Sequence, residues 1–497
     1  MYTSFINYHS FVDSCLIKQM WETMKTQIHH FDVLVIGGGV VGCAILRELA
    51  RYQASVALVE RNADICEGTS KSNSAIVHTG FDAPPGSLEA RLLANARDLW
   101  PTVIEDLHIP YLQTGALMLA VTPEDMQTIE EQIIPKAARN GVTLQRLTRE
   151  EILENAPYVN SEILGGVLVE GEGVIDPFWT TRAYCENAIL NGARVFTGEG
   201  VTELRVDEAQ VFVRTDGGHE FTASLVINAA GLWSDEIARL VGDTSFSIRP
   251  RKGQFVLVED DHGVAQIILP VPNKVSKGIL VTPIVFGGIM LGPTAEDVEE
   301  KTDLATTAEG VRVIREGVRK YVPTVAEAES VRQFAGLRAV GSENDYIIRS
   351  SSAGSRLLHV AGIRSTGLSA SPAIGRYVGE LVCTRLGLTL RADFQAAMPE
   401  YLEETQTDEA DVVCLCRSIT RGEILAALRS PLPPGSIDGL KRRTGAMLGD
   451  CQGNLCLPCI LDLFQQELGR DLLTLPKHLA QSSLVTARLS HSAQQED

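Results

Sequence analysis

The stretch from Phe31 to Glu60 constrains the fold most strongly, because it alternates strand, glycine turn, helix and strand. The apolar run Val33–Ile36 predicts a buried parallel strand that leads directly into the turn 37–42. Residues 43–52 have the pattern of a helix, and a second apolar run, 56–59, ends at Glu60. This order predicts a βαβ unit.

The spacing of three glycines in this turn predicts a dinucleotide site. Gly37 permits the tight turn, Gly39 lets the backbone approach a pyrophosphate, and Gly42 lets the helix pack closely on the strand. The helix N-terminus offers unpaired N–H groups and a positive dipole end to the phosphates. Glu60 falls where an acid accepts hydrogen bonds from an adenosine ribose.

Length and charge narrow the possible partners. A chain of 497 residues predicts two to four domains with a sizeable core. The net charge of −19 argues against nucleic acid as a partner, since a phosphate backbone needs a basic surface. We find no run of about twenty apolar residues, so we expect no membrane span, although peripheral membrane association stays open.

Residues 1–30 show neither the basic segment and apolar core of a signal peptide nor clear strand or helix patterning. We therefore expect a cytoplasmic protein with a disordered N-terminal extension. Met24 resembles a normal start for this kind of domain, so residues 1–23 could also reflect an over-long start.

The predicted fold class is α/β: a Rossmann-type dinucleotide-binding domain interleaved with a β-rich (α+β) substrate domain, followed by a small helical unit. Two later strands each lead into a glycine: the strand 223–228 runs on to Gly231, and the strand 356–361 is followed by Gly362. Both segments are expected to belong to the first domain. We expect the first domain at 31–108, 171–247 and 342–393, the substrate domain at 109–170 and 248–341, a linker at 394–410, the helical unit at 411–480 and a disordered tail at 481–497.

Nine short motifs follow one another in order between Asp32 and Ile374. Together they resemble the D-amino-acid-oxidase superfamily of flavoproteins, and more narrowly its glycerol-3-phosphate oxidase/dehydrogenase and L-2-hydroxyglutarate oxidase branch. The motifs are DVLVIGGGVVGC, TSKSNSAIVHTGFD, GVIDP, INAAGLWSD, RPRKGQF, KGILVTP, GGIMLGPTAED, FAGLRA and GIRSTGLSASPAI.

This resemblance implies that the dinucleotide is FAD rather than NAD. The matching positions for FAD are Gly37, Gly39, Gly42, Glu60, Thr69, Ser70, Ser74, Val201, Ala230, Gly231, Gly362, Gly367 and Leu368. The helix that follows the last of these would aim its positive end at the pyrimidine side of the flavin and stabilise the reduced anion.

Four further residues carry the implied catalysis. His78 matches a histidine beside the flavin that is proposed to take the substrate hydroxyl proton, a role that suits imidazole near neutral pH. Arg338 and Lys277 match positions that bind the anionic end of the substrate. Ser365 matches a serine that contacts substrate, and it could equally cap the following helix. Arg364 departs from the acidic or amide residue usual there and adds positive charge near the site.

Five of the ten cysteines lie between residues 414 and 459. This region resembles the bacterioferritin-associated-ferredoxin-like [2Fe-2S] domain, which implies Cys414, Cys416, Cys451 and Cys456 as ligands. Cys459 offers an alternative pair with Cys456, and four thiolates would also suit zinc. A [2Fe-2S] cluster would pass electrons singly from the flavin, which favours a dehydrogenase with a protein or quinone-linked acceptor.

We therefore expect an FAD-dependent dehydrogenase of a small anionic hydroxy compound. Glycerol 3-phosphate is the first candidate substrate and L-2-hydroxyglutarate the second. The other hypotheses are an amino-acid or amine oxidase, an electron-transfer subunit of a larger complex, and a redox or iron sensor without a substrate.

Overall fold

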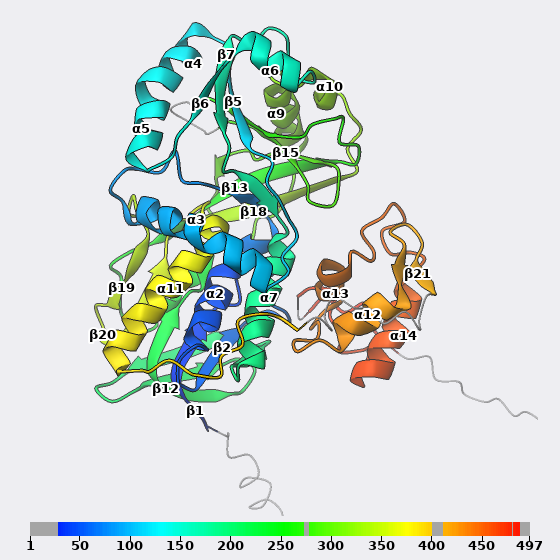
Figure 1. Ribbon diagram of the computed structural model, residues 1–497. Helices are drawn as coiled ribbons and strands as arrows, with labels where there is room; N and C mark the ends of the chain where they lie inside the picture. The colour runs from blue at the N-terminus through cyan, green and yellow to red at the C-terminus, as the bar shows by residue number, and fades with distance from the viewer. Residues whose placement is uncertain (1–27, 273–277, 400–410, 480, 488–497) are drawn as a thin grey trace, which may run out of the picture.

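The computed structural model describes residues 28–272, 278–399, 411–479 and 481–487. Two large sheets and one small sheet form the main body, and a small unit near the C-terminus packs beside helix α7 (Figure 1). Among the described residues, no helix combines the length and the apolar character that crossing a bilayer requires.

The first sheet holds the predicted glycine turn. Its strands follow the order β10-β11-β12-β1-β2-β9, with β20 added to β12 and β19 to β20. The neighbours of β1 run parallel to it, so their carboxyl ends meet at one edge. The bounds are β1 Ile28–Ile36, β2 Val56–Glu60, β9 Arg194–Thr197, β10 Val201–Val206, β11 Val211–Thr215, β12 Glu220–Asn228, β19 Ile347–Ser351 and β20 Gly354–Ala361.

Helices cover this sheet and supply its main core. Helix α2 packs between α7 and α11, and α11 also packs on α3 (Figure 1). Fully buried side chains such as Leu46, Leu58 and Leu92 fill the space between these elements. The bounds are α2 Val40–Leu49, α3 Leu88–Asp106, α7 Pro177–Leu190, α8 Ser234–Arg239 and α11 Gly367–Leu386.

The second sheet forms the other lobe of the body. Its order is β17-β13-β16-β15-β14-β5-β7-β6, with β18 paired antiparallel to β13. The strands are β5 Ala116–Ala120, β6 Gln145–Thr148, β7 Gly165–Val169, β13 Ile248–Val258, β14 Ile267–Pro270, β15 Leu280–Pro283, β16 Ile289–Gly292, β17 Glu296–Asp297 and β18 Arg332–Gly341. The helices of this lobe are α4 Pro123–Thr128, α5 Ile134–Arg139, α6 Arg149–Asn155, α9 Ala308–Arg319 and α10 Pro323–Ala326.

A third sheet of three short strands has the order β3-β8-β4. Its strands are β3 Ile76–Val77, β4 Tyr111–Leu112 and β8 Gly173–Ile175. Strand β3 pairs antiparallel with β8, and Val77 lies opposite Gly173. This register brings the residue after β3, His78, beside the residue before β8, Glu172.

The C-terminal unit has its own core, in which Leu428, Leu440 and Phe464 are fully buried. Its elements are β21 Val412–Cys414, β22 Ile419–Thr420, α12 Arg421–Leu428, α13 Ile437–Thr444 and α14 Leu457–Leu468. The described part of the predicted linker packs on the first domain, because Met398 is buried and Ala396 accepts a hydrogen bond from Arg47 at 3.0 Å.

The expected start of the first domain needs correction. Strand β1 begins at Ile28, where it pairs with Glu220, so residues 28–30 are not part of an extension; residues 1–27 lie outside the described part.

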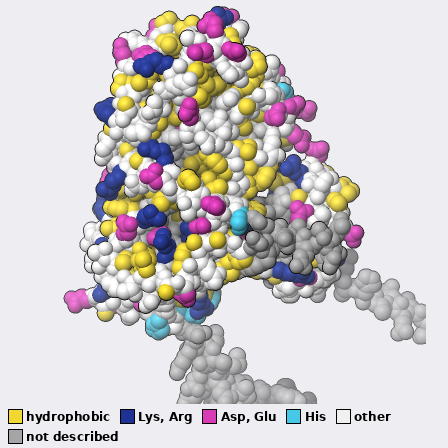
Figure 2. Space-filling view, in the orientation of Figure 1, with side chains coloured by type: hydrophobic (Ala, Val, Ile, Leu, Met, Phe, Trp, Pro, Cys, Tyr) yellow, Lys and Arg dark blue, Asp and Glu magenta, His cyan; other side chains and the backbone are white. Residues whose placement is uncertain are grey.

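In the second lobe, a π-helical segment, Ile129–Ile133, lies between α4 and α5. On the face in Figure 2, Lys and Arg side chains lie scattered among acidic and uncharged ones.

Candidate active site

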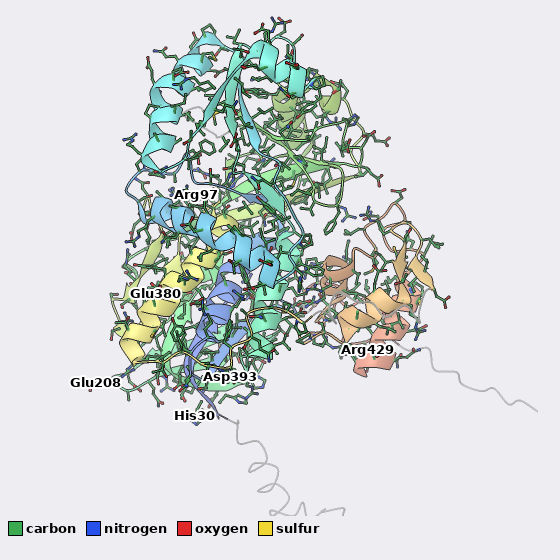
Figure 3. The ribbon with its side chains drawn as sticks, in the orientation of Figure 1. His30, Arg97, Glu208, Glu380, Asp393 and Arg429 are labelled. Atoms are coloured by element: carbon green, nitrogen blue, oxygen red, sulfur yellow. The ribbon has the colours of Figure 1, made fainter. Side chains whose placement is uncertain are left out.

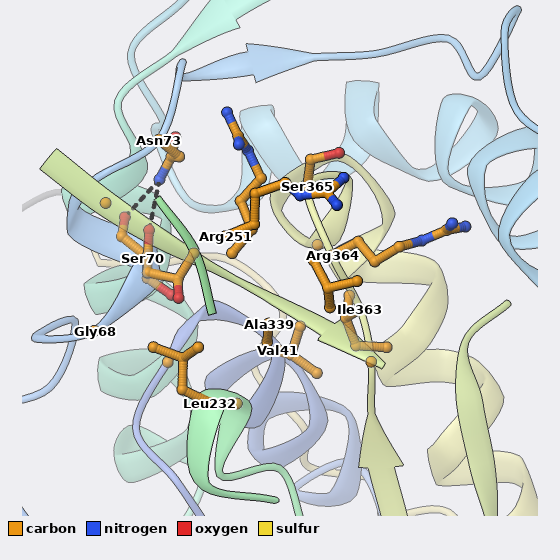
Figure 4. Close-up of a pocket in the computed structure, with 18 of the residues that line it drawn as sticks. Val41, Gly68, Ser70, Asn73, Leu232, Arg251, Ala339, Ile363, Arg364 and Ser365 are labelled. Carbon is orange, nitrogen blue, oxygen red and sulfur yellow. Dashed lines mark hydrogen bonds between the residues drawn. The ribbon is translucent and has the colours of Figure 1, made fainter. Parts of the chain in front are cut away.

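A single cavity of about 1120 Å³ collects most of the residues expected to bind cofactor and substrate. It is lined by the glycine turn after β1, the loop after β2, the segment between β20 and α11, and parts of β13 and β18. Figure 4 shows this meeting of distant segments: Val41 and Leu232 come from the first domain, and Arg251 and Ala339 from the second sheet. Sixteen of the seventeen predicted flavin and substrate positions fall among the described residues, and all but Gly42 line this cavity.

The three glycines of the turn have different structural roles. Gly37 has φ +112°, and a Cβ there would lie 2.5 Å from the carbonyl oxygen of Ala229. A Cβ on Gly42 would collide with the carbonyl oxygen of Gly37, so Gly42 serves the close packing of α2 rather than the cavity wall. Gly39 lines the cavity at the N-terminus of α2, where helical N–H groups attract phosphate.

Glu60 is buried at the end of β2 and lines the same cavity. Its Oε2 accepts the N–H of Gly38 at 2.7 Å, and its Oε1 accepts the backbone N–H of Asn62 at 2.9 Å. Burial raises the pKa of Glu60, and the hydrogen bonds from Asn62 and Gly38 oppose that rise. The carboxylate therefore ties the glycine turn to β2 at the position expected to meet a ribose.

The other predicted flavin positions come from four separate segments of the chain. Ser70 accepts the N–H of Val40, the first residue of α2, at 2.9 Å. Thr69 donates its hydroxyl to the carbonyl of Leu337 at 2.7 Å, so this side chain links two cavity walls. The remaining members that line the cavity are Ser74, Val201, Ala230 and Gly231.

A second helix also points its N-terminus at the cavity. Gly362 turns the chain after β20 with φ +65°, and α11 begins at Gly367 with Leu368 next to it, all of them lining the cavity. Two helix N-termini and a glycine turn at one large cavity fit a long, anionic, two-ended cofactor such as FAD.

His78 lies in the cavity wall and is held by a buried acid. Its Nδ1 lies 2.8 Å from Oε2 of Glu172, whose side chain is completely buried. The other oxygen of Glu172 accepts the N–H of Thr79 at 2.7 Å and its hydroxyl at 2.8 Å. An imidazole that donates Nδ1–H to a carboxylate carries its lone pair on Nε2, which is the form that a general base needs.

Sequence reasoning missed Glu172, although this residue immediately precedes the quoted GVIDP motif. The signal that could have identified Glu172 is its position directly before strand β8, which pairs with β3, the strand that precedes His78. That signal depends on the pairing of β3 with β8, which the sequence did not predict.

Arg338 places a cation at the substrate end of the cavity. Its guanidinium donates to the carbonyl of Thr294 at 3.1 Å, and no carboxylate of the described residues forms an ion pair with it. Burial, and secondarily the neighbouring Arg251, lowers the pKa of Arg338 to about 10. Arg251 lies opposite it in the β13–β18 pair and binds Asp297 at 2.6 Å, and the exposed Arg249 also lines the cavity.

Ser365 is an exposed member of the cavity wall, as Figure 4 shows, and a bridge between Ala339 and Arg364 brings its loop against β18. Arg364 forms an ion pair with Glu89 of α3. Arg364 thus brings the expected positive charge to the cavity wall, and the buried carboxylate of Glu89 compensates it. Lys277 lies outside the described residues.

The C-terminal cysteines come together as two pairs of thiols. Hydrogen bonds from the backbone of Leu455, then from the thiol of Cys416, lower the pKa of Cys451. Burial and the neighbouring Cys414 raise the pKa of Cys456 to about 11. Gly449 lets the loop that carries Cys451 pass close to Cys416, because a Cβ at residue 449 would collide with the Cβ of Cys416.

Four thiols in two pairs suit the ligand set of a two-iron cluster. No group of three or more His, Cys, Asp or Glu side chains in the described part of the chain is placed to hold a metal ion. Two pairs of thiols, with backbone N–H groups of the loop directed at sulfur, are what two irons bridged by sulfide require. Cys459 is exposed and is not among the groups that shift the pKa of Cys451 or Cys456.

Comparisons with known families cover nearly the whole described chain. The family model described as "FAD dependent oxidoreductase" matches residues 32–381. The model described as "BFD-like [2Fe-2S] binding domain" matches residues 412–466.

Individual relatives cover between 75% and 92% of this chain. A glycerol 3-phosphate dehydrogenase of Caloramator mitchellensis is 34% identical over 92% of this chain and 98% of its own length. One component of the anaerobic glycerol-3-phosphate dehydrogenase of Escherichia coli K12 is 28% identical over 86% of each chain. The solved L-α-glycerophosphate oxidase of Mycoplasma pneumoniae with FAD bound has a TM-score of 0.71 at 29% identity, over 75% of this chain and 99% of its own.

Proposed function

The chain belongs to the FAD-dependent oxidoreductase family, and from this premise we propose that it oxidises glycerol 3-phosphate to dihydroxyacetone phosphate. A relative that is 34% identical and covers 92% of this chain carries the name glycerol 3-phosphate dehydrogenase. The observation within this structure that carries the proposal is the guanidinium of Arg338 in the cavity wall.

Arg338 suits the phosphate end of such a substrate. The cation is largely withdrawn from water, lacks a carboxylate partner among the described residues, and lines the cavity that also holds His78. A guanidinium fork can donate two parallel hydrogen bonds to phosphate oxygens, and such charge-assisted bonds are strong when shielded from water. Arg251, opposite it in the β13–β18 pair, is neutralised by Asp297, so Arg338 is the cation that the proposal assigns to the phosphate.

His78 would take the proton of the C2 hydroxyl on Nε2 while the C2 hydride leaves. Bound FAD supplies the hydride acceptor for this reaction. Glu172 holds the ring by Nδ1 and stabilises the imidazolium that forms. The positive ends of α2 and α11 would hold the cofactor's phosphates and its reduced ring.

The C-terminal unit, residues 411–479, contains the five clustered cysteines and is named the cysteine unit. It would carry the electrons away from the active site. Cys414, Cys416, Cys451 and Cys456 would hold a [2Fe-2S] cluster, which supplies one-electron transfer. An acceptor protein or quinone-linked partner would then receive the electrons.

The competing substrate, L-2-hydroxyglutarate, also has a hydroxyl beside an anionic group. Steady-state oxidation with ferricyanide as the acceptor separates these two hypotheses and also tests the amino-acid oxidase hypothesis, for which glycine and L-proline are the probes. We expect kcat/KM for glycerol 3-phosphate to exceed that for L-2-hydroxyglutarate, for glycine and for L-proline by about tenfold or more. A higher value for any of the other three would contradict the proposal.

A further inference from the structure

The segment after β2, from Arg61 through the 3₁₀ turn Thr69–Lys71, forms a loop with two faces. One face lines the large cavity through Arg61, Asn62, Glu67, Gly68, Thr69 and Ser70. The other face is buried against the cysteine unit, which follows about 370 residues later in the chain. The same short loop therefore contacts both the predicted FAD site and the unit that carries the predicted cluster ligands.

Two ion pairs fasten the cysteine unit to this loop. Arg443 of α13 donates to both carboxylate oxygens of Asp64, at 2.6 and 3.0 Å, and both side chains are at most 5% exposed. Burial alone would lower the pKa of Arg443, but Asp64, together with Glu186 and Cys185, raises it overall. Arg442 pairs with Glu67, which also accepts from Lys71 at 2.7 Å.

The backbones at this contact approach closely. A Cβ on Gly435 would collide with the carbonyl oxygen of Ala63, and a Cβ on Gly439 would collide with the carboxylate of Asp64. The N–H of Gly435 donates to Asp64 at 3.3 Å. Contacts of this closeness, with two desolvated ion pairs, are typical of a fixed interface rather than a loose tether.

From this contact the loop leads directly to the glycine turn. Lys71, the partner of Glu67, follows Ser70, which accepts the first N–H of α2. Figure 4 shows Gly68 and Ser70 in the cavity wall, with Asn73 donating to the carbonyl of Ser70 at 2.8 Å. The side chains that hold the cysteine unit thus also hold the loop that positions the predicted phosphate site.

Strand β18 makes a second connection. Arg332 at its start donates to Oε1 of Gln452 at 2.8 Å and to the carbonyl of Leu448 at 3.4 Å, both in the loop that carries Cys451. Arg338, six residues further along the strand, lies in the cavity wall. With a rise of about 3.3 Å per residue, the strand spans roughly 20 Å between the two sites.

We propose that Arg442, Arg443 and Arg332 are positioning residues that couple the two cofactor sites, so that seating of the cysteine unit tightens FAD binding and FAD binding tightens the seating. This inference rests on the proposed function only in placing FAD in the cavity and the cluster on the cysteines. By linkage, each site must change the other's binding by the same factor.

The test measures FAD affinity of full-length protein stripped of flavin, without any substrate. Arg442→Gln and Arg332→Gln should each weaken FAD binding by roughly fivefold or more, and Arg442→Lys should bind FAD more tightly than Arg442→Gln. Arg429→Gln is the matched control. Arg429, labelled on this unit in Figure 3, is 60% exposed and pairs with Glu467 at 2.8 Å, so this variant should bind FAD like the unsubstituted protein.

Hydrogen exchange of the unsubstituted protein tests the reciprocal effect without any variant. Addition of FAD should slow exchange over 435–456, which lies outside the FAD cavity. Unchanged exchange there, or FAD affinities of Arg442→Gln and Arg332→Gln within twofold of the control, would overturn the coupling. Because no substrate is used, the wrong choice of substrate under the proposed function would leave these results unaffected.

Discussion

Nδ1 of His78 lies 2.8 Å from Oε2 of Glu172, and the same carboxylate accepts two further hydrogen bonds from Thr79. A buried acid that is fully engaged in this way fixes the orientation and the tautomer of the imidazole. The proposed proton transfer therefore depends on a residue that does not itself line the cavity.

Replacing Glu172 by Gln should reduce kcat by about tenfold or more, because an amide can present an N–H to Nδ1 and reverse the tautomer. The flavin content of the purified variant should stay unchanged. Steady-state kinetics with deuterium at C2 of the substrate check the cause, since a larger isotope effect reports a slower chemical step. Unchanged kcat with full flavin content would show that the acid has no role in positioning His78.

Arg338 should make the KM for glycerol 3-phosphate depend on pH in alkaline solution. Its pKa is lowered to about 10, so the guanidinium is charged below that pH and loses its proton above it. The phosphate is already a dianion throughout this range. KM should therefore rise between about pH 9 and 11.

The matched variant for this prediction is Arg338→Gln. Its KM should be raised about tenfold or more at neutral pH, since a charged hydrogen bond is lost, and should not change further up to pH 11. A KM that rises equally steeply in the variant would assign the alkaline effect to another group.

We expect mild acidification to release FAD, because the carboxylate of Glu60 becomes protonated. Burial raises the pKa of this carboxyl, so it takes up a proton at a higher pH than an exposed glutamate, and the neutral form has one acceptor fewer for a ribose. The apoprotein should respond in the opposite direction, because the cost of burying the ionised form disappears as pH falls through the raised pKa. Flavin fluorescence follows release, and thermal unfolding follows stability.

The control for this prediction is Glu60→Gln, which cannot titrate. It should bind FAD less tightly at neutral pH and lose little more affinity on acidification. If the variant and the unsubstituted protein lose FAD in parallel, Glu60 is not the titrating group.

From the two pairs of thiols, we expect Cys416 and Cys451 to be needed for cluster binding and Cys459 to be dispensable. Cys416→Ser and Cys451→Ser should each abolish the visible absorbance of the cluster and the iron content of about two per chain. Cys459→Ser should retain both. Loss of iron in the Cys459 variant would reassign the ligand set, and stoichiometric zinc in place of iron would replace the cluster by a single-ion site.

The parts of the site that could be predicted from the sequence are those whose residues lie close together along the chain. Gly37, Gly39 and Glu60 lie within thirty residues, and a single βαβ unit determines their relation. Strand β1 was predicted too short because Ile28, His29 and His30 lie on its less buried end, where an apolar run gives no signal.

The relations that escaped prediction join distant segments. His78 and Glu172 are 94 residues apart and meet only through the pairing of β3 with β8. Arg442 and Glu67 are 375 residues apart. The compensation of Arg364 by Glu89 likewise depends on how α3 packs beside α11.

Anaerobic mixing of the purified, flavin-loaded protein with sn-glycerol 3-phosphate tests the central claim most directly. The proposed function predicts rapid bleaching of the flavin absorbance near 450 nm (on the order of 1–10³ s⁻¹), with dihydroxyacetone phosphate as the product. An unbleached flavin in the presence of saturating glycerol 3-phosphate, in a preparation that dithionite reduces fully, would contradict it.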